Sequence, residues 1–114
     1  NISYIFFYAR DFNSDLSDWD VSSVATINFM FYRAFSFNSD ISKWKVSNVM
    51  NKSFTFSQVG YRAVEVFYPD LSNWNVSNVM NMSGMFYFLD SFNSDLSNWD
   101  VSKVTDMSNS VFRN

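Results

Sequence analysis

Large apolar side chains return along the chain at nearly constant intervals. The four tryptophans are separated by 25, 30 and 25 residues, and neighbouring apolar positions keep the same spacing. The equivalent positions are Trp19, Trp44, Trp74 and Trp99; Phe12, Phe37, Phe67 and Phe92; Leu16, Ile41, Leu71 and Leu96; Val21, Val46, Val76 and Val101; and Val24, Val49, Val79 and Val104. A period of 25 residues with one five-residue insertion predicts a repeat array.

The apolar spacing changes within each repeat. Trp74 and Val76 alternate with polar residues, which is typical of a strand. The positions that follow have the i, i+3, i+4, i+7 spacing of a helix, as in Met82, Met85, Phe86 and Leu89. The helical set recurs as Ile27, Met30, Phe31 and Ala34, and it opens the chain as Ile2, Ile5, Phe6 and Ala9. Each repeat is therefore predicted to be a strand followed by a helix.

The residue before each helical set carries a short polar side chain. These residues are Thr26, Asn51, Asn81 and Asp106. A side-chain oxygen at such a position satisfies the free N–H groups in the first turn of a helix. The column is therefore predicted to be a set of helix N-caps.

These elements predict one repeat array over residues 1–114. It comprises a partial repeat, 1–11, and the repeats 12–36, 37–66 with the insertion, 67–91 and 92–114. One such unit cannot bury enough apolar surface to fold alone, so the units must stack. The predicted fold is an α/β solenoid, similar to a leucine-rich repeat, with about four 25-residue coils of strand plus helix and one short parallel sheet. Each tryptophan is expected to lie over its counterpart in the adjoining coil.

Composition argues against several functional classes. The net charge is −3 and the pI is near 4.5, without any basic cluster larger than Lys43 and Lys45, so nucleic acid is not an expected partner. The chain has no cysteine for thiolate metal sites, and it has no histidine or G-x-S-x-G motif for catalysis. We expect no enzyme activity, cofactor or metal. No apolar run approaches the roughly 20 residues that cross a bilayer. The chain opens at Asn1 without an initiator Met, which favours a fragment or a processed product.

The repeated phrase D-[L/I]-S-x-W-x-V-S-x-V-x-x-M-x-x-M-F-x-x-A, seen from Asp70 onward, resembles the BspA-like leucine-rich-repeat surface proteins, including the mycoplasma lipoprotein-associated repeats. The general pattern L-x-x-L-x-L-x-x-N is met by Leu71, Trp74 and Val76, but Val79 stands at its asparagine position. The resemblance implies a bacterial or protist cell-surface protein that binds other proteins, host matrix or neighbouring cells. It implies no catalytic site.

Two groups of residues are candidates for contact with a partner. The first lies between the inward Trp and Val positions and comprises Asp20, Lys45, Asn75 and Asp100. The second belongs to the insertion and comprises Tyr61, Arg62, Glu65 and Tyr68, since insertions in repeat arrays often lie on the binding face. The alternatives are a solvated face for the first group and a neutral insertion for the second.

A column of aspartates, Asp15, Asp40, Asp70 and Asp95, would place like charges near one another in stacked repeats. Two arrangements would compensate them. Each carboxylate accepts backbone N–H groups in an Asx turn, or the column binds calcium. The recurring F-N-S-D phrase lacks the glycine and the multiple acidic ligands of a calcium loop, which favours the turn.

Four Asn-x-Ser sequons begin at Asn1, Asn51, Asn75 and Asn81. They are possible N-glycosylation sites if the chain passes through a eukaryotic secretory pathway. A chain this rich in Asn and Ser also produces such triplets by chance.

The helical segments carry nine more rings than their inward faces need: Tyr4, Phe7, Tyr8, Phe29, Tyr32, Phe35, Phe54, Tyr87 and Phe88. They form an outer interaction patch or cover one another between neighbouring elements. Tyr4, Phe7 and Tyr8 make the N-terminal end apolar and open, whereas Ser110 and Asn114 suggest a capped C-terminal end.

The sequence therefore predicts a non-catalytic extracellular or cell-surface module for protein recognition or adhesion. Its expected partner is a protein or cell-surface ligand. The alternative is a structural subunit that polymerises end to end into an extracellular filament, with copies of itself as partners.

Overall fold

Tight turns recur along the described backbone. The computed structural model describes residues 1–60, 67, 69–89, 92 and 94–109. These residues contain no helix and no strand. Three isolated parallel bridges join Thr26 to Asn51, Asn51 to Asn81 and Asn81 to Asp106.

The predicted α/β solenoid is therefore wrong. The described residues contain neither the helix nor the strand that was expected in each 25-residue coil, and no parallel sheet forms. The molecule is instead a compact body with extents of 35 × 33 × 21 Å and a radius of gyration of 12.8 Å. The hydrogen bonds of the two predicted elements show why neither forms.

The predicted helix fails because alternate N–H groups bond in different directions. The N–H of Met30 donates to the Ile27 carbonyl at 3.1 Å, three residues back, whereas the N–H of Phe31 donates to Thr55 at 3.0 Å. An α-helix requires each N–H to bond four residues back in the same segment. Phe29 and Arg33 also have positive φ angles, 56° and 57°, which a right-handed helix does not allow.

The predicted strand fails because tight turns close on both sides of it. Trp44 and Val46 are buried and Lys45 is exposed, as alternation requires. However, the Trp44 N–H bonds to the Ile41 carbonyl and the Val49 N–H bonds to the Val46 carbonyl, at 3.1 and 3.0 Å. The extended stretch between these turns is too short for a ladder of strand hydrogen bonds.

The tight turns follow a five-residue phrase. It consists of Asp or Asn, an apolar residue, Ser, a variable residue and a second apolar residue, as in 70–74, 75–79 and 81–85. In 70–74 the Asp70 carboxylate accepts the Ser72 N–H at 3.1 Å, and the Trp74 N–H donates to the Leu71 carbonyl at 3.0 Å. The same two bonds recur in 81–85. The phrase therefore specifies a tight turn opened by an Asx turn.

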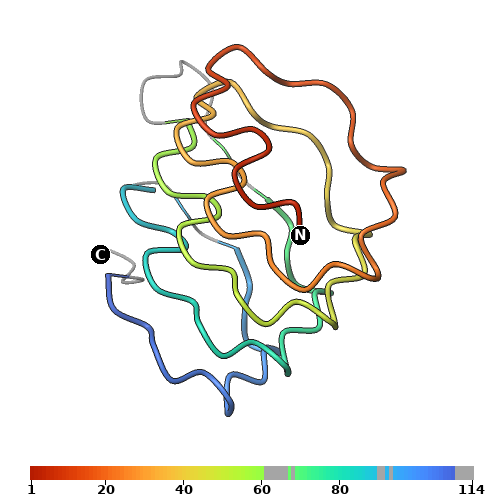
Figure 1. The fold of residues 1–114 in the computed structure, drawn as a ribbon, viewed down its shortest axis with the longest axis vertical. Coiled ribbons are helices and arrows are strands. Elements are labelled where there is room, and N and C mark those ends of the chain that lie inside the picture. The colour runs from red at the N-terminus through yellow and green to blue at the C-terminus, as the bar shows by residue number, and fades with distance from the viewer. Residues whose placement is uncertain (61–66, 68, 90–91, 93, 110–114) are drawn as a thin grey trace.

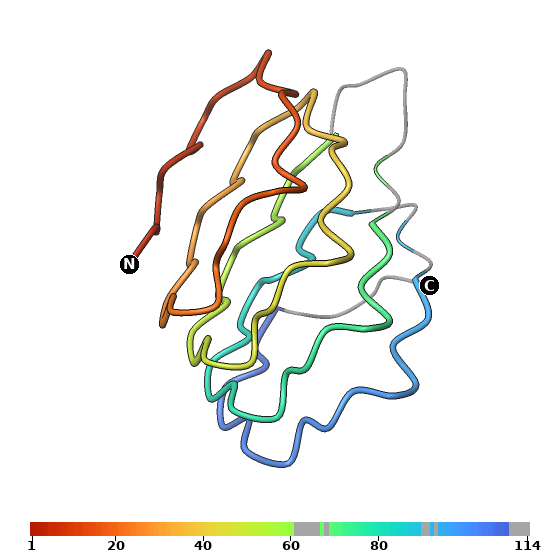
Figure 2. The same cartoon turned by 90° about the vertical axis from the view of Figure 1, so that its right-hand side faces the viewer.

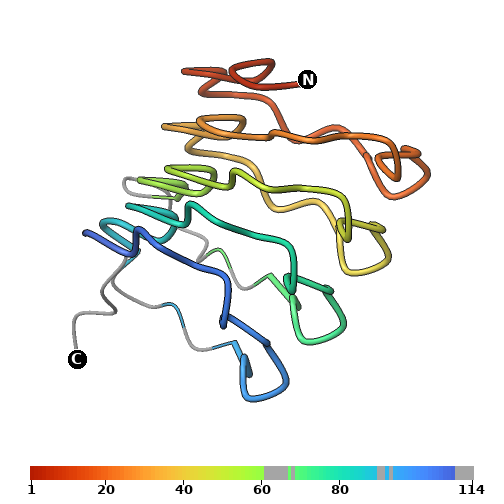
Figure 3. The same cartoon turned by 60° about the horizontal axis from the view of Figure 1, so that its bottom comes forward.

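Successive windings of the chain lie on one another as layers (Figures 1 and 2). We define the layers as the described residues within 1–25, 26–50, 51–80 and 81–105, and residues 106–109 begin the next layer. Figure 3 shows them in chain order, from the red first layer to the blue last one. Backbone hydrogen bonds connect them, for example from Phe31 to Thr55 and from Phe56 to Met85, both at 3.0 Å. A helix would bond all of these N–H groups within its own segment. Here about half of them donate to carbonyl groups of the neighbouring layer.

Tryptophan side chains also connect the layers. The rings of Trp44 and Trp74 are nearly parallel, at 5°, with centroids 6.5 Å apart, which confirms the expected stacking for this pair. Three indole N–H groups donate to a carbonyl of the preceding layer: Trp44 to Leu16 (2.9 Å), Trp74 to Ile41 (3.0 Å) and Trp99 to Leu71 (3.0 Å).

The core is a set of columns of equivalent side chains. Phe6, Phe31, Phe56 and Phe86 form a central column, with successive centroids 5.6, 5.8 and 6.1 Å apart. Phe31 is fully buried and stacks on Phe37 within its own layer at 3.9 Å. The inward positions predicted from periodicity are buried in the middle layers, even though they do not lie on helices or strands.

Candidate functional site

The predicted N-cap column does not cap helices. Asn51, Asn81 and Asp106 each accept the N–H of the serine two residues ahead, at 2.9 to 3.0 Å. Thr26 instead donates its hydroxyl to Asn28 Oδ1 at 2.7 Å. The four residues form the parallel bridges between layers. The side-chain oxygens of Asn51, Asn81 and Asp106 accept a backbone N–H, as expected of an N-cap. Because no helix follows, this bond begins a tight turn.

The aspartate column makes Asx turns, which confirms the interpretation that the sequence favoured. Asp15, Asp40, Asp70 and Asp95 accept the backbone N–H of Ser17, Ser42, Ser72 and Ser97, respectively, at 2.9 to 3.1 Å. Hydrogen bonds from the serine hydroxyl and then from the serine N–H lower the pKa of each carboxyl. No cluster of three or more metal-ligating side chains occurs in the described part of the chain.

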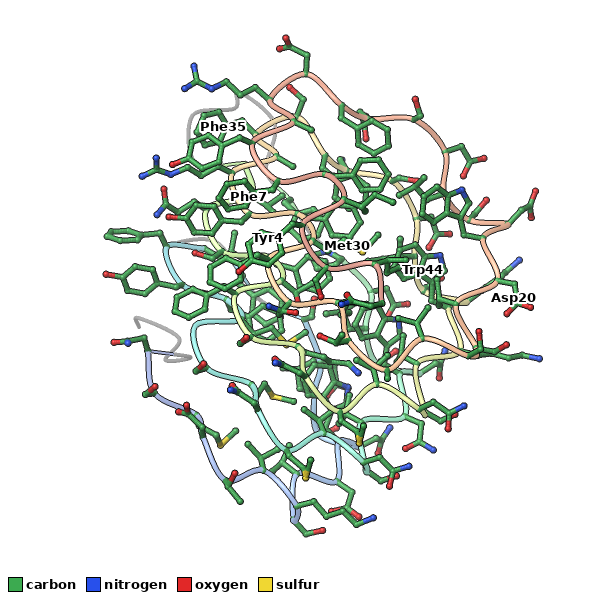
Figure 4. All side chains as sticks on the ribbon, in the orientation of Figure 1. Tyr4, Phe7, Asp20, Met30, Phe35 and Trp44 are labelled. Carbon is green, nitrogen blue, oxygen red and sulfur yellow. The ribbon has the colours of Figure 1, made fainter. Side chains whose placement is uncertain are left out.

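The first group of candidate partner residues, Asp20, Lys45, Asn75 and Asp100, is exposed. We call the surface that carries them the polar side of the molecule. Figure 4 shows Asp20 on the side opposite Tyr4 and Phe7. Asp20, Asn75 and Asp100 each accept a serine N–H in their own five-residue phrase, at 3.0 or 3.1 Å. These three polar groups are therefore engaged locally, and Lys45 is the member without such a role.

The second candidate group lies outside the described residues. It consists of the insertion residues Tyr61, Arg62, Glu65 and Tyr68. Their role as a contact site remains a prediction from the sequence. Ser110 and Asn114, which suggested a capped end, also lie outside the described residues.

The sequon asparagines differ in exposure. Asn51 and Asn81 are half-buried in the bridge column, whereas Asn1 and Asn75 are exposed. In all four, Oδ1 accepts the N–H of the sequon serine. Glycosylation remains a prediction, and Asn1 and Asn75 are the more accessible positions.

Two shallow grooves lie on the polar side. One, of about 440 Å³, is lined by Asn13, Asp15, Ser17, Asp18, Asn38, Ser39, Asp40 and Lys43. The other, of about 470 Å³, is lined by Ser42, Lys43, Trp44, Lys45, Val46, Ser47, Asn73 and Asn75. Asp15 and Asp40 in the first groove and Asn75 in the second are held in Asx turns.

A second surface carries the nine surplus rings, and we call it the aromatic face. It comprises Tyr4, Phe7, Tyr8, Phe29, Tyr32, Phe35, Phe54, Tyr87 and Phe88, none of which is fully buried. The most exposed rings are those of Tyr4, Phe7, Tyr8 and Phe88, at 51%, 41%, 39% and 39%. Figure 4 shows Tyr4, Phe7 and Phe35 near one another, on the same half of the molecule in that view.

Ring contacts connect the aromatic face across layers. Tyr4, Phe29 and Phe54 form a ladder with centroids 5.0 and 4.9 Å apart and nearly parallel planes. Phe7 stacks on Tyr32 at 5.2 Å and touches Tyr4 edge-on at 5.4 Å. The rings therefore cover one another in part and also leave an outer surface, so both sequence interpretations hold in part.

Arg33 fixes the rings beside it. Its guanidinium donates to the Tyr8 hydroxyl and, through Nε, to Gln58 Oε1 at 2.7 Å. It also lies over the rings of Tyr8 and Tyr32, at 5.1 and 5.5 Å. The aromatic face therefore holds the Arg33 cation among its rings, and the Arg10 guanidinium lies 5.7 Å over the ring of Phe35.

Comparison with protein families assigns the chain. A family model described as "Mycoplasma protein of unknown function, DUF285" matches residues 1–64 and again 58–114. The chain belongs to this family. The family is related to BspA-like mycoplasma repeat proteins. No curated protein and no solved structure matches the chain. In the part of the chain that the structure describes, no helix has the length and apolar character to cross a membrane.

Sequence reasoning missed three features. The five-residue phrase was visible as D-L-S-N-W and N-V-S-N-V but was read as part of a longer period. Gly84 lies inside a predicted helix, where a glycine argues against the helix, and its φ is +58°. Lys52 occupies the repeat position of Ile27 and Met82 and is fully buried there.

Proposed function

We propose that this chain is a non-catalytic repeat module that recognises or adheres to other proteins at the cell surface or outside the cell. Its contact surface is the aromatic face. The observation that carries the proposal is the connected set of partly exposed rings around Tyr4, Phe7 and Tyr8. Contiguous exposed apolar surface of this kind is typical of protein interaction sites.

The chemistry of the aromatic face suits a protein partner. Tyrosine, phenylalanine and arginine are enriched at the centres of protein interfaces, and tyrosine and arginine often dominate the binding energy. Arg33 and the ladder under Tyr4 hold these rings in place before binding. A preorganised surface loses little conformational entropy when it binds. The candidate group on the polar side is a weaker choice for the contact surface. Its members Asp20, Asn75 and Asp100 already accept hydrogen bonds within their own turns.

The resemblance of the repeat phrase supports the same class of function, whereas the matched family is itself described as of unknown function. The repeat phrase resembles those of BspA-like surface proteins, and the chain belongs to a family described from Mycoplasma. The resemblance implies binding to host matrix or to neighbouring cells. We therefore propose extracellular matrix and intact animal cells as the first targets to test.

The test measures binding of the fluorescently labelled full chain to an immobilised extracellular-matrix extract and to intact animal cells. A variant with Phe7→Ser, Tyr8→Ser and Phe88→Ser removes three exposed rings. It is expected to bind at least about tenfold more weakly, because truncating an interface aromatic often costs about 2 kcal/mol. A matched control, Met50→Ser with Met80→Ser, removes apolar groups that are 45% and 49% exposed but lie outside the aromatic face. This control should bind like the wild type.

Two outcomes would contradict the proposal. In one, the triple variant binds both targets as well as the wild type does. In the other, the wild type binds neither target better than an unrelated protein of similar net charge. Circular dichroism melts of all variants establish that each is folded under the binding conditions.

A further inference from the structure

Lys45 occupies a repeat position that holds Asp or Asn in the other three layers. Its equivalents are Asp20, Asn75 and Asp100. The side-chain oxygen of each equivalent accepts the N–H of the serine two residues ahead, at 3.0 or 3.1 Å. A lysine side chain has no acceptor atom, so it cannot form this bond. The layer that contains Lys45 therefore has no Asx oxygen at this turn.

This substitution leaves a backbone donor without a partner. The N–H of Ser47 is the equivalent donor, and it has no acceptor among the described residues. The tight turn itself is unchanged, since the Val49 N–H donates to the Val46 carbonyl at 3.0 Å, as the Val79 N–H does to the Val76 carbonyl. The Ser47 N–H therefore lies in the same turn as its bonded equivalents but makes no bond.

Ser47 lines the groove of about 470 Å³ together with two lysines. Lys43 and Lys45 are both exposed and line the same groove. Neither ammonium group has a hydrogen-bond or salt-bridge partner in the part of the chain that the structure describes. The pKa of Asp20 is lowered first by the Ser22 hydroxyl and then by the Ser22 N–H, and the charge of Lys45 contributes least. Both ammonium groups therefore remain available in the groove.

The next layer adds an amide to the groove. Asn75 lines it, and its Oδ1 accepts both the N–H and the hydroxyl of Ser77, at 3.1 and 2.7 Å. Because the Ser77 N–H can only donate, these bonds fix the orientation of the amide. The Asn75 Nδ2 has no acceptor among the described residues. The groove therefore brings together two ammonium groups, an amide N–H₂ and a backbone N–H, and each of them is a donor.

We propose that this groove binds a carboxylate group carried by an acidic peptide segment of a partner protein. One carboxylate oxygen accepts the Ser47 N–H, as Asp20 accepts the Ser22 N–H at 3.0 Å in its own layer. The ammonium groups of Lys43 and Lys45 compensate the charge of the carboxylate and donate charge-assisted hydrogen bonds to it. The partner thereby supplies the oxygen that an Asp or Asn side chain supplies in the other layers.

An acidic peptide suits the groove better than a lone carboxylate ion. Exposed ammonium groups give a single ion little net affinity in water. The groove is larger than one carboxylate group, and the Asn75 Nδ2 offers a donor to a second acceptor, such as a peptide carbonyl. The net charge of −3 also disfavours an acidic partner over most of the surface, so such a partner is expected to bind where the cations lie together.

The experiment follows the backbone amide of Ser47 in proton–nitrogen NMR spectra of the isotope-labelled full chain. The probe is the acetylated and amidated tetrapeptide Gly-Asp-Asp-Gly, and the control peptide is Gly-Asn-Asn-Gly. The acidic peptide should shift the Ser47 amide with a Kd on the order of 1 mM, and the neutral peptide should not shift it. Added salt should weaken the binding, because it screens the lysine charges.

Substitutions that copy other layers test the role of each donor. Lys45→Asn copies Asn75 and provides an internal acceptor for the Ser47 N–H, so it should bind the acidic peptide at least about tenfold more weakly. Lys43→Asn removes only a charge and should weaken the binding less. Lys103→Asn is the matched control, since it removes the same charge at an exposed position outside the groove, and it should bind like the wild type.

Any of the following outcomes would overturn the proposal. The Ser47 amide does not shift with the acidic peptide, or it shifts as far with the neutral one. Lys45→Asn binds as tightly as the wild type, or Lys103→Asn loses as much affinity as Lys45→Asn, which would indicate a general effect of charge. Glucuronate shifts the Ser47 amide at a lower concentration than the peptide does, which would assign the groove to an acidic sugar.

Two further comparisons keep the test decisive. If Lys45→Asn fails to fold, Lys43→Asn compared with Lys103→Asn tests the groove in its place, and equal affinities of these two variants would overturn the proposal. The groove is separate from the aromatic face, so the variant with Phe7→Ser, Tyr8→Ser and Phe88→Ser should still bind the acidic peptide. Failure of the proposed adhesion and failure of this site are therefore distinguishable.

Discussion

Residues 70–74 on the polar side and residues 81–85 on the aromatic side have the same five-residue phrase but serve different neighbours. In both, an Asx turn opens the phrase and its fifth residue donates to the carbonyl of its second. In 81–85, the N–H groups of Met82 and Gly84 also bond to the next layer. The polar phrase makes no such backbone bond to another layer among the described residues, and Trp74 connects it through a side chain.

The spacing of the layers differs in the same way. Ring centroids are 4.9 Å apart between Phe29 and Phe54 but 6.5 Å apart between Trp44 and Trp74. Figure 3 shows the layers closer together on the side of the aromatic ladder. The same turn motif can therefore form hydrogen bonds only within itself or also to a neighbouring layer. The outcome depends on whether its alternate N–H groups lie near a carbonyl of that layer.

The largest expected effect comes from the central column that both sides share. Phe31→Ala removes a fully buried ring that contacts Phe6, Phe37 and Phe56. We expect a loss of about 3–5 kcal/mol in the free energy of unfolding, measured by urea titration with tryptophan fluorescence. Phe88→Ala, at a ring 39% exposed, is the control and should cost much less. Equal losses would mean that the stacked column is not the core.

The second prediction concerns the buried cation on the aromatic side. Burial lowers the pKa of Lys52 from 10.5 to about 7. Its Nζ has the Val46 carbonyl at 3.5 Å and the Trp74 ring at 5.8 Å, with no carboxylate partner among the described residues. Lys52→Met, which copies the equivalent Met82, should therefore stabilise the fold by on the order of 3 kcal/mol at pH 7 and below.

The pH dependence follows from the proton balance. Between pH 7 and 10.5 the unfolded chain holds the Lys52 proton more tightly than the folded chain, so wild-type stability rises with pH in this window. The advantage of Lys52→Met should shrink across the same window. Urea titrations of both proteins at pH 6, 8 and 10 measure the difference, and a constant difference would contradict the assignment.

The third prediction tests the close approach of layers at Gly84. A Cβ added there would lie 2.3 Å from Cε1 of Phe54, and φ is +58°. Gly84→Ala should cost about 2 kcal/mol, because it combines a steric clash with a left-handed backbone. In a Phe54→Ala background only the backbone cost should remain. A thermal melt series of the four proteins gives the coupling, and additivity would exclude the clash.

The smallest effect is expected on the polar side. Asp70→Asn keeps an acceptor for the Ser72 N–H and should leave the melting temperature nearly unchanged, whereas Asp70→Ala loses the Asx turn and should lower it slightly. Since the Ser72 hydroxyl and N–H lower the Asp70 pKa, its contribution should disappear as the pH falls through that lowered pKa. A large loss in Asp70→Ala would indicate that this side also holds layers together.

The candidate site was predictable in its residues but not in its arrangement. The nine surplus rings were identified because they exceed the inward positions of the repeat, and the structure leaves all of them at least partly exposed. The ladder of Tyr4, Phe29 and Phe54 was not predictable, because it depends on positive φ values of 63°, 56° and 53° that bulky residues rarely adopt. The role of Arg33 depends on the same local backbone, since it too has positive φ.

The sequence by itself determined which apolar positions are buried in the middle layers and that the aspartate column forms Asx turns. Both follow from chemistry within a few residues: apolar side chains leave water, and an Asp or Asn oxygen accepts the N–H two residues ahead. Only the tertiary structure decided between helix and tight turns, since Met82, Met85 and Phe86 have a spacing that both conformations bury. The conformation depends on which carbonyl accepts each N–H group. A carbonyl in the neighbouring layer can accept one only after the layers have stacked, so the sequence of a single repeat does not specify it.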